Sequence, residues 1–198
     1  AFLVRVNLKG AKLPLRPLFT RGLGSAITLG AGGSAGQEGP IAAIGGTIGS
    51  QFGQLFKVSG DRLKVLVACG AAAGVAATFN APIAGVFFAT EIVLLSSFEL
   101  ASFTSIVIAS SMATVVSRAL LGDHSELIAP PYFVGNYWEI ALYLLLGLII
   151  GALAAGFIDL HIRIKDRIDA IKLPRFVKLL LVGLAVGTIG TIFPQVFG

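Results

Sequence analysis

The chain has 198 residues, of which 56% are hydrophobic and 13% charged, and its mean hydropathy is +0.90. These values exceed those of an ordinary soluble domain, and the apolar runs are too long and too unalternating for the strands of a membrane barrel. The composition predicts an all-α polytopic membrane protein. The net charge of +5 then reflects basic loops on one side of the membrane rather than nucleic-acid binding.

Few residues are suited to catalysis or metal binding. The single Cys69 excludes an internal disulfide and a cysteine metal cluster, and His124 and His161 are far apart in the chain. A membrane-embedded hydrolase needs a nucleophile with a base nearby, and neither histidine falls in the expected membrane core. We therefore expect no metal, no cofactor and no enzymatic activity, with an unrelated membrane-embedded enzyme as a distant alternative.

The chain begins with a basic lead-in at residues 1–20, and helices are predicted at residues 14–31 and 38–56. The first is long enough to be embedded in a membrane, whereas the second reaches only partway on its own. Glycines at positions 45, 46, 49 and 53 of the second helix permit close helix packing in lipid.

Between these helices lies the sequence Gly-Gly-Ser-Ala-Gly-Gln-Glu-Gly-Pro-Ile, residues 32–41. Its glycines let the backbone turn and approach a ligand closely, and Pro40 suits the first turn of a helix. The pattern predicts a helix that begins inside the membrane with unpaired N–H groups facing a cavity, which is a favourable site for an anion. Because Glu38 lies at that N-terminus, its carboxylate can occupy the site, which indicates an anion pathway gated by Glu38. The alternative is a glutamate that only caps the helix.

A third helix, at residues 61–78, precedes a second break at Phe-Asn-Ala-Pro, residues 79–82. The apolar segment at 83–90 is too short to span a membrane. Two interrupted segments so close together indicate a transporter-type binding site built from broken helices. We expect Asn80 and Pro82 to shape this break rather than to contact the anion.

The remaining elements are a helix at 96–121, a polar loop at 122–136, a long helix at 137–170 and a last helix from about residue 176. Basic residues collect at 5–21, 57–64 and 163–178, whereas residues 122–139 hold three acids and no Lys or Arg. The positive-inside rule places the basic segments in the cytoplasm. We expect a multi-pass integral protein of the cell (inner) membrane.

Both breaks carry motifs of a known family. Gly-Gln-Glu-Gly-Pro at 36–40 is similar to the glycine–basic–Glu–Gly–Pro signature of the CLC family of chloride channels and chloride/proton exchangers. Residues 70–85 resemble a second, longer signature of that family, and the similarity continues through 88–91. The resemblance covers the whole chain, and implies that residues 1–198 are a piece of a CLC transmembrane domain. That piece would hold most of the first inverted repeat, from its fourth helix, and the start of the second repeat.

The resemblance also implies a homodimer in a lipid bilayer, with a separate pore in each subunit that carries chloride or a similar small anion, and protons. Glu38 would be the gate that competes with the anion and carries the proton, within a loop shaped by Gly36 and Pro40. Residues 83–90 and the helix after them would lie in the dimer interface. The outer anion site would be lined by backbone N–H groups, those of Gln37, Glu38, Gly39 and Ile41.

Two positions depart from the family pattern. Gln37 replaces the usual Arg or Lys, which should slow anion entry more than it abolishes binding, because the amides remain. Glu91 matches the first of two acids in bacterial exchangers, but Ile92 replaces the second, the internal proton glutamate. An apolar residue there is typical of channels, so a channel is slightly favoured and a chloride/proton antiporter is the alternative. Glu91 is either part of an internal proton path or a structural hydrogen-bonding group.

Overall fold

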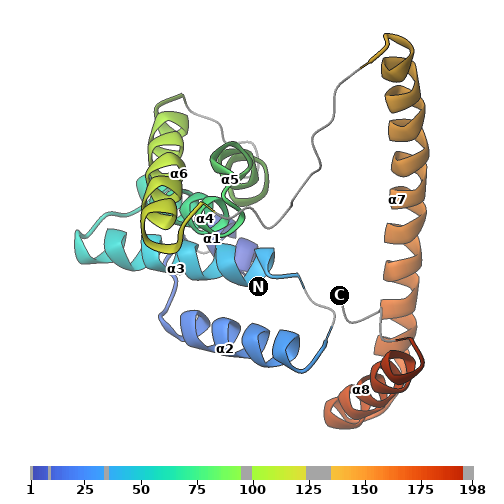
Figure 1. The fold of residues 1–198 in the computed structure, drawn as a ribbon. Helices are drawn as coiled ribbons and strands as arrows, with labels where there is room; N and C mark the ends of the chain where they lie inside the picture. The colour runs from blue at the N-terminus through green and yellow to red at the C-terminus, as the bar shows by residue number, and fades with distance from the viewer. Residues whose placement is uncertain (1, 9, 34–35, 95–99, 124–134, 194–198) are drawn as a thin grey trace. The chain divides into compact units, whose positions relative to one another are not determined.

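The computed structural model describes all residues except 1, 9, 34–35, 95–99, 124–134 and 194–198 (Figure 1). All elements in the described part of the chain are helices, as the composition predicts. The chain divides into two compact units, Ala1–Ile128 and Ala129–Gly198. The expectation that both belong to one transmembrane domain stays a prediction.

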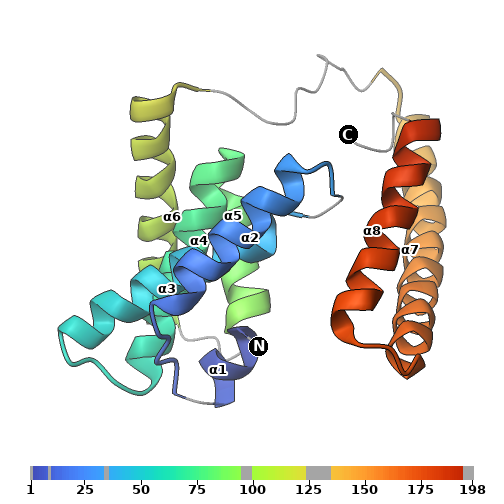
Figure 2. The ribbon, with the colours of Figure 1, turned by 90° about the horizontal axis from the view of Figure 1, so that it is seen from below.

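The first unit holds six α-helices and one π-helical turn among its described residues. They are α1 (Phe2–Leu8), α2 (Arg16–Gly30), α3 (Glu38–Leu55), α4 (Asp61–Phe79), α5 (Pro82–Phe88), the π-helix η1 (Ala89–Val93) and α6 (Leu100–Leu121). The starts of α3 and α4 coincide with the predicted ones. In the second unit, α7 (Trp138–Ala170) and α8 (Arg175–Ile192) begin within one residue of the predicted positions (Figure 2).

The first predicted helix is shorter than expected. α2 has 15 residues, about 22 Å of helix, which is less than the roughly 30 Å hydrocarbon core of a bilayer. Within the described residues, three helical segments are long and apolar enough to cross a membrane: α4, Ser102–Leu121 of α6, and α7.

Helix α1 is absent from the sequence prediction, which has only a basic lead-in at residues 1–20. Val6 on α1 is fully buried, and the ring of Phe2 lies against Gly46 of α3. The two apolar side chains are four residues apart, so they share one face of a helix. A helix of seven residues is too short for this pattern to stand out in the sequence.

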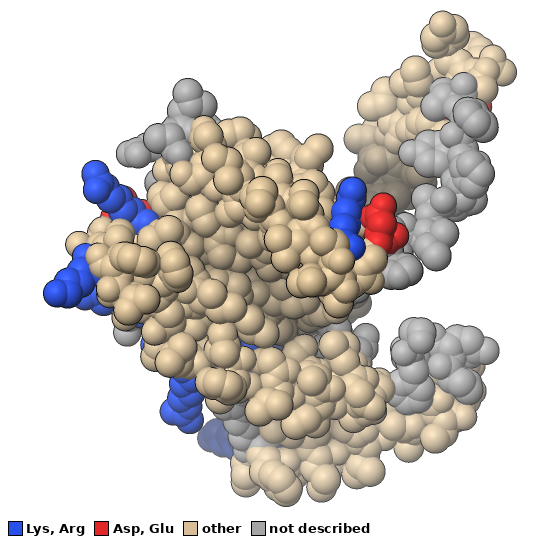
Figure 3. Space-filling view, turned by 60° about the vertical axis from the view of Figure 1, so that its left-hand side comes forward, with Lys and Arg blue, Asp and Glu red and all other residues tan. Residues whose placement is uncertain are grey.

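The core of the first unit is centred on α4, which lies among the other helices of that unit in Figures 1 and 2. Its buried apolar side chains are Leu63, Val67, Ala68, Ala71, Ala72, Val75 and Ala76. Val93 of η1 and Ile106 of α6 belong to the same core and are fully buried. The outer surface is mostly uncharged on the face drawn in Figure 3, as expected where protein faces lipid rather than water.

Helices α3 and α4 approach so closely that their backbones touch. A Cβ atom on Gly45 would overlap the carbonyl oxygen of Gly70, and a Cβ atom on Gly70 would overlap the carbonyl oxygen of Gly45. One turn further along α3, a Cβ atom on Gly49 would overlap the carbonyl oxygen of Leu66. The glycines of α3 therefore allow the close packing that the sequence predicts.

Replacing Gly45 or Gly70 by Val should destabilise the protein by about 1–3 kcal/mol, because the added atoms meet backbone that cannot move aside. Thermal unfolding of the detergent-solubilised protein measures the loss. The control is Gly30→Ala in α2, since nothing lies within 4 Å of a Cβ atom there. Equal stability of the Gly70 variant and this control would contradict the packing described.

Candidate functional site

The first candidate site is the N-terminus of α3, at the break between α2 and α3. Glu38 is the first residue of α3, and no side chain caps this end of the helix. In the first turn, the amides of Glu38 and Gly39 have no acceptor within the helix, and Pro40 has no N–H. The N–H of Ile41 donates to the carbonyl oxygen of Gln37 at 3.0 Å. Of the four amides predicted to line an anion site, that of Ile41 is therefore already hydrogen-bonded within the first turn.

The carboxylate of Glu38 folds back over the loop that precedes its own helix. A Cβ atom on Gly36 would overlap the Oε2 atom of Glu38, so glycine at position 36 is what lets the carboxylate lie there. The Glu38 side chain is exposed, and it forms no ion pair with any residue in the described ranges. The structure thus places the predicted gate residue and Gly36 in direct contact.

A cavity of about 220 Å³ lies beside this loop, between α2 and the start of α3. Gly36 and Pro40 line one side of it. The rest of its lining comes from one face of α2, at Thr20, Arg21, Gly24, Ser25 and Thr28. The sequence analysis did not identify this polar face, although the spacing of its residues at i, i+4 and i+8 is a helical signal.

Arg21 is the charged residue of this cavity and is half-buried. Its guanidinium brings a positive charge to the neighbourhood of the motif, in which Gln37 stands where the CLC signature has a basic residue. Within the described residues, no group of three or more His, Cys, Asp and Glu side chains could hold a metal ion. His124 lies outside those residues.

The second break, between α4 and α5, has the form that the sequence predicts. Asn80 ends α4 in the left-handed conformation, with φ 53°, and Pro82 begins α5. Proline suits a first helical position because the missing N–H has no partner there. Asn80 and Pro82 thus stand at the two sides of the break, and their role in shaping it stays a prediction.

Side chains of α6 hydrogen-bond to the backbone around this break. The hydroxyl of Ser110 donates to the carbonyl oxygen of Pro82 at 2.6 Å, and that of Ser117 to Ala77 at 2.9 Å. The hydroxyl of Thr114 lies 3.4 Å from the carbonyl oxygen of Ala76. Ala76 and Ala77 lie in the last turn of α4, where carbonyl groups have no partner later in the same helix and need others away from water. The sequence analysis did not identify these residues, although positions 110, 114 and 117 fall on one helical face.

At the exposed end of the same break, Asn80 hydrogen-bonds to the charged side chains of Arg118 and Asp123. The Nε atom of Arg118 donates to the Oδ1 atom of Asn80 at 2.6 Å, and the Nδ2 atom of Asn80 donates to the Oδ1 atom of Asp123 at 2.6 Å. Arg118 and Asp123 also form an ion pair at 3.3 Å. Asn80 is thus held by two charged side chains from the end of α6 and the residues that follow it.

Glu91 lies within the π-helical turn η1, which corrects the expected end of the short helix at residue 90. The helix continues to Val93, and the N–H of Leu94 donates to the carbonyl oxygen of Ala89 at 3.0 Å, five residues back. Both Glu91 and its neighbour Ile92 are exposed. Glu91 is therefore in the middle of a distorted turn, a feature that is frequent at functional sites.

The sequence and the fold match known proteins over almost the whole chain. The family described as "Voltage gated chloride channel" matches residues 3–198. Chloride channel protein CLC-e of Arabidopsis thaliana is 36% identical over 201 residues, which covers 96% of this chain and 28% of that protein. The H(+)/Cl(-) exchange transporter ClcA of Vibrio parahaemolyticus is 33% identical over 176 residues, with coverage of 83% and 37%.

A solved structure agrees with these relatives. The crystal structure of a slow cyanobacterial Cl-/H+ antiporter matches with a TM-score of 0.76 and 28% identity, and the match covers 93% of this chain and 45% of that chain. The chain spans less than half the length of each of these three proteins.

Ser110→Ala should destabilise the protein by about 1 kcal/mol, because a hydrogen bond from the buried Ser110 hydroxyl to the carbonyl oxygen of Pro82 is lost. Thermal unfolding in detergent measures the effect. Ser111→Ala is the matched control, since Ser111 is the next residue of α6 and is exposed. If the two variants unfold at the same temperature, the Ser110 hydroxyl does not support the break.

Proposed function

The chain belongs to the voltage-gated chloride channel family, and on that premise we propose that it forms part of a membrane pathway for chloride or a similar small anion, gated by Glu38. It is an all-α, multi-pass membrane protein with the CLC fold. The observation that carries the proposal is the carboxylate of Glu38 folded over Gly36 at the uncapped N-terminus of α3.

The proposed mechanism is competition for the positive end of a helix. The free amides of the first turn and the helix dipole attract either the Glu38 carboxylate or an anion from solution. Two negative groups cannot share that position without strong repulsion. Protonation of Glu38, or displacement of its side chain by the anion, would then open the pathway. We propose that the amides of Gln37, Glu38, Gly39 and Ile41 line the anion site, and that Ile41 shares its N–H between the anion and the carbonyl oxygen of Gln37.

Residues around the motif support an anion rather than a cation. Arg21 adds positive charge to the cavity beside Gly36 and Pro40. Glu38 is the single acidic residue among the first 60 positions, against six basic ones. Such a distribution raises the local concentration of anions and lowers that of cations.

Whether anion movement is coupled to protons is a separate proposal. Ile92, 42% exposed on η1, has no ionisable group and favours a channel. The similarity to proteins named as Cl-/H+ antiporters and exchange transporters favours exchange, which is the second candidate function. In that case the exposed Glu91 is the carboxylate we propose for the internal proton path. No observation favours an enzyme.

We propose a homodimer in the lipid bilayer. α5 and α6 expose large apolar side chains, among them Ile83, Phe87, Ile108 and Met112. Exposed apolar side chains of this kind are covered either by lipid or by another subunit. The whole of residues 1–198 would then be one partial transmembrane domain.

Glu38→Gln removes the charge of the proposed gate and should give chloride efflux that no longer changes with pH. The native full-length protein in liposomes is the sample, and a chloride electrode follows efflux at several pH values. Glu139→Gln is the matched control, because Glu139 is the acid in the first turn of α7. Efflux from the Glu38 variant that keeps the pH dependence of the wild type would refute the gate.

Chloride efflux and external pH recorded together distinguish the two candidate functions. For a channel, as Ile92 suggests, chloride leaves without proton movement. For an antiporter, a chloride gradient drives protons uphill, and Glu91→Gln should then reduce the proton flux relative to the chloride flux. If no chloride moves through the wild-type protein, the proposed function is wrong.

A further inference from the structure

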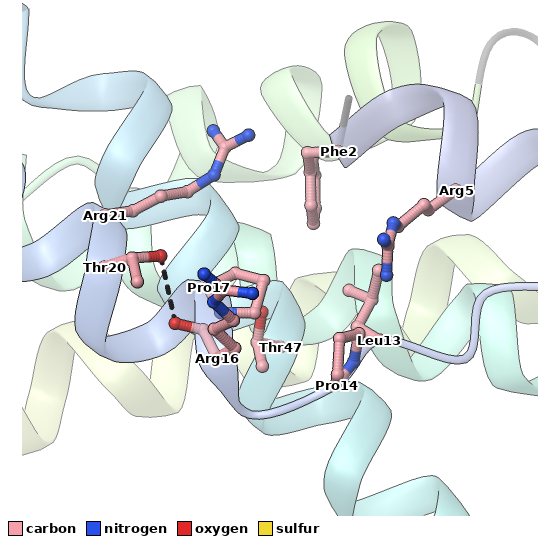
Figure 4. Close-up of a pocket in the computed structure, with 9 residues that line it drawn as sticks. All are labelled: Phe2, Arg5, Leu13, Pro14, Arg16, Pro17, Thr20, Arg21 and Thr47. Atoms are coloured by element: carbon pink, nitrogen blue, oxygen red, sulfur yellow. Dashed lines mark hydrogen bonds between the residues drawn. The ribbon is translucent and has the colours of Figure 1, made fainter.

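A second cavity, separate from the motif at residues 36–40, gathers three arginines. It has a volume of about 180 Å³ and lies where α1, the start of α2 and the middle of α3 meet (Figure 4). Arg5 comes from α1, and Arg16 and Arg21 come from α2. The remaining lining residues are Phe2, Leu13, Pro14, Pro17, Thr20 and Thr47.

The positive charge of this cavity has no protein counterion. In Figure 4, Arg5 and Arg21 stand on the two sides of the Phe2 ring. None of the three arginines forms an ion pair in the described part of the chain, where the acids pair with Lys64, Arg118 and Arg163 instead. Glu38, the one acid among residues 1–60, lies over Gly36 instead. Arg5 and Arg16 are exposed and Arg21 is half-buried, so the three guanidinium groups leave a positively charged cavity that is open to an anion from outside the chain.

The wall of the cavity is fixed by hydrogen bonds. The buried hydroxyl of Ser50 accepts from the N–H of Leu13 at 2.9 Å and donates to the carbonyl oxygen of Ala11 at 2.7 Å. The side-chain amide of Gln51 donates to the carbonyl oxygen of Leu13 at 2.5 Å. These bonds tie the linker between α1 and α2 to the face of α3 that also carries Thr47. The positions from which Arg5 and Arg16 reach the cavity are thus set before any ligand binds.

We propose that this cavity binds a phosphate group, either of free phosphate or of a lipid headgroup. A guanidinium presents several N–H donors in a rigid fork that matches the oxygens of phosphate, and chloride offers no such set of acceptors. The cavity exceeds the roughly 30 Å³ of one water, so it holds more than a single solvent molecule. Its arginines belong to the basic segment at residues 5–21, which the positive-inside rule places in the cytoplasm, and basic pockets on that side of a membrane protein recognise lipid headgroups.

Arg21 lines this cavity and also the cavity beside Gly36. The phosphate site and the candidate gate therefore meet at one side chain. For that reason the test uses Arg5 and Arg16, which line the phosphate cavity and not the cavity beside Gly36.

The test is the thermal unfolding temperature of the native full-length protein in detergent, measured with two probes. Inorganic phosphate is titrated against sodium chloride of equal ionic strength, and phosphatidic acid is added to the micelles against phosphatidylcholine. We expect phosphate or phosphatidic acid to raise the unfolding temperature of the wild-type protein. A response to both probes assigns free phosphate as a ligand, and a response to phosphatidic acid alone assigns the lipid headgroup.

Arg5→Gln combined with Arg16→Gln should raise the half-maximal probe concentration about tenfold or more, as expected when two charge-assisted contacts are lost. Arg16→Lys keeps the positive charge but lacks the forked guanidinium group. Its half-maximal probe concentration should lie between those of the double variant and the wild type. Arg62→Gln is the control, because Arg62 is exposed at the start of α4 and lines neither cavity.

Three results would overturn the site. The first is that neither probe stabilises the wild type. The second is that chloride at equal ionic strength stabilises it as much as phosphate does. The third is that Arg62→Gln weakens the response to the probes as much as the double variant does. None of these measurements involves anion transport, so the proposed function and the phosphate site succeed or fail separately.

Discussion

The backbone contact between α3 and α4 is the constraint on which the first unit depends. Gly45 and Gly70 each occupy a place where any side-chain atom would overlap the carbonyl oxygen of the other. In lipid, helices gain little from burying apolar surface against one another, so close backbone packing is a main source of their association. α4 can then lie at the centre of the unit, and the N-terminus of α3 is positioned by a pair of helices rather than by one.

The two helix breaks meet the same difficulty in different ways. A helix that ends within a membrane leaves backbone groups without hydrogen-bonding partners. At the α4–α5 break, the hydroxyl of Ser117 bonds to the carbonyl oxygen of Ala77 in the last turn of α4, and that of Ser110 bonds to the carbonyl oxygen of Pro82 at the start of α5. At the start of α3, no side chain caps the free amides. The first arrangement makes a stable structural joint, whereas the second leaves donors available for a ligand.

Local chemistry explains what the sequence predicted correctly. Asn80 and Pro82 restrict the backbone themselves, so the break between α4 and α5 can be placed from the sequence alone. Likewise, the glycines and Pro40 before residue 41 predict the start of α3 at Glu38. The features that were missed depend on neighbours in space: α1 is a helix because Phe2 meets Gly46, and Arg21 faces the motif only because α2 packs against α3. The π-helical turn that holds Glu91 also has no signal in the residues themselves.

The contact between Gly45 and Gly70 also limits how the proposed gate can move. Two helices whose backbones already touch cannot slide or tilt against each other without separating, and separation would leave voids along α4. The contact therefore favours a gate that opens by movement of the Glu38 side chain rather than by displacement of α3. Rotation of a side chain takes picoseconds to nanoseconds when it is exposed, whereas rearrangements of helices take microseconds or longer. Gating in this chain would accordingly involve almost no change in the volume or heat capacity of the protein.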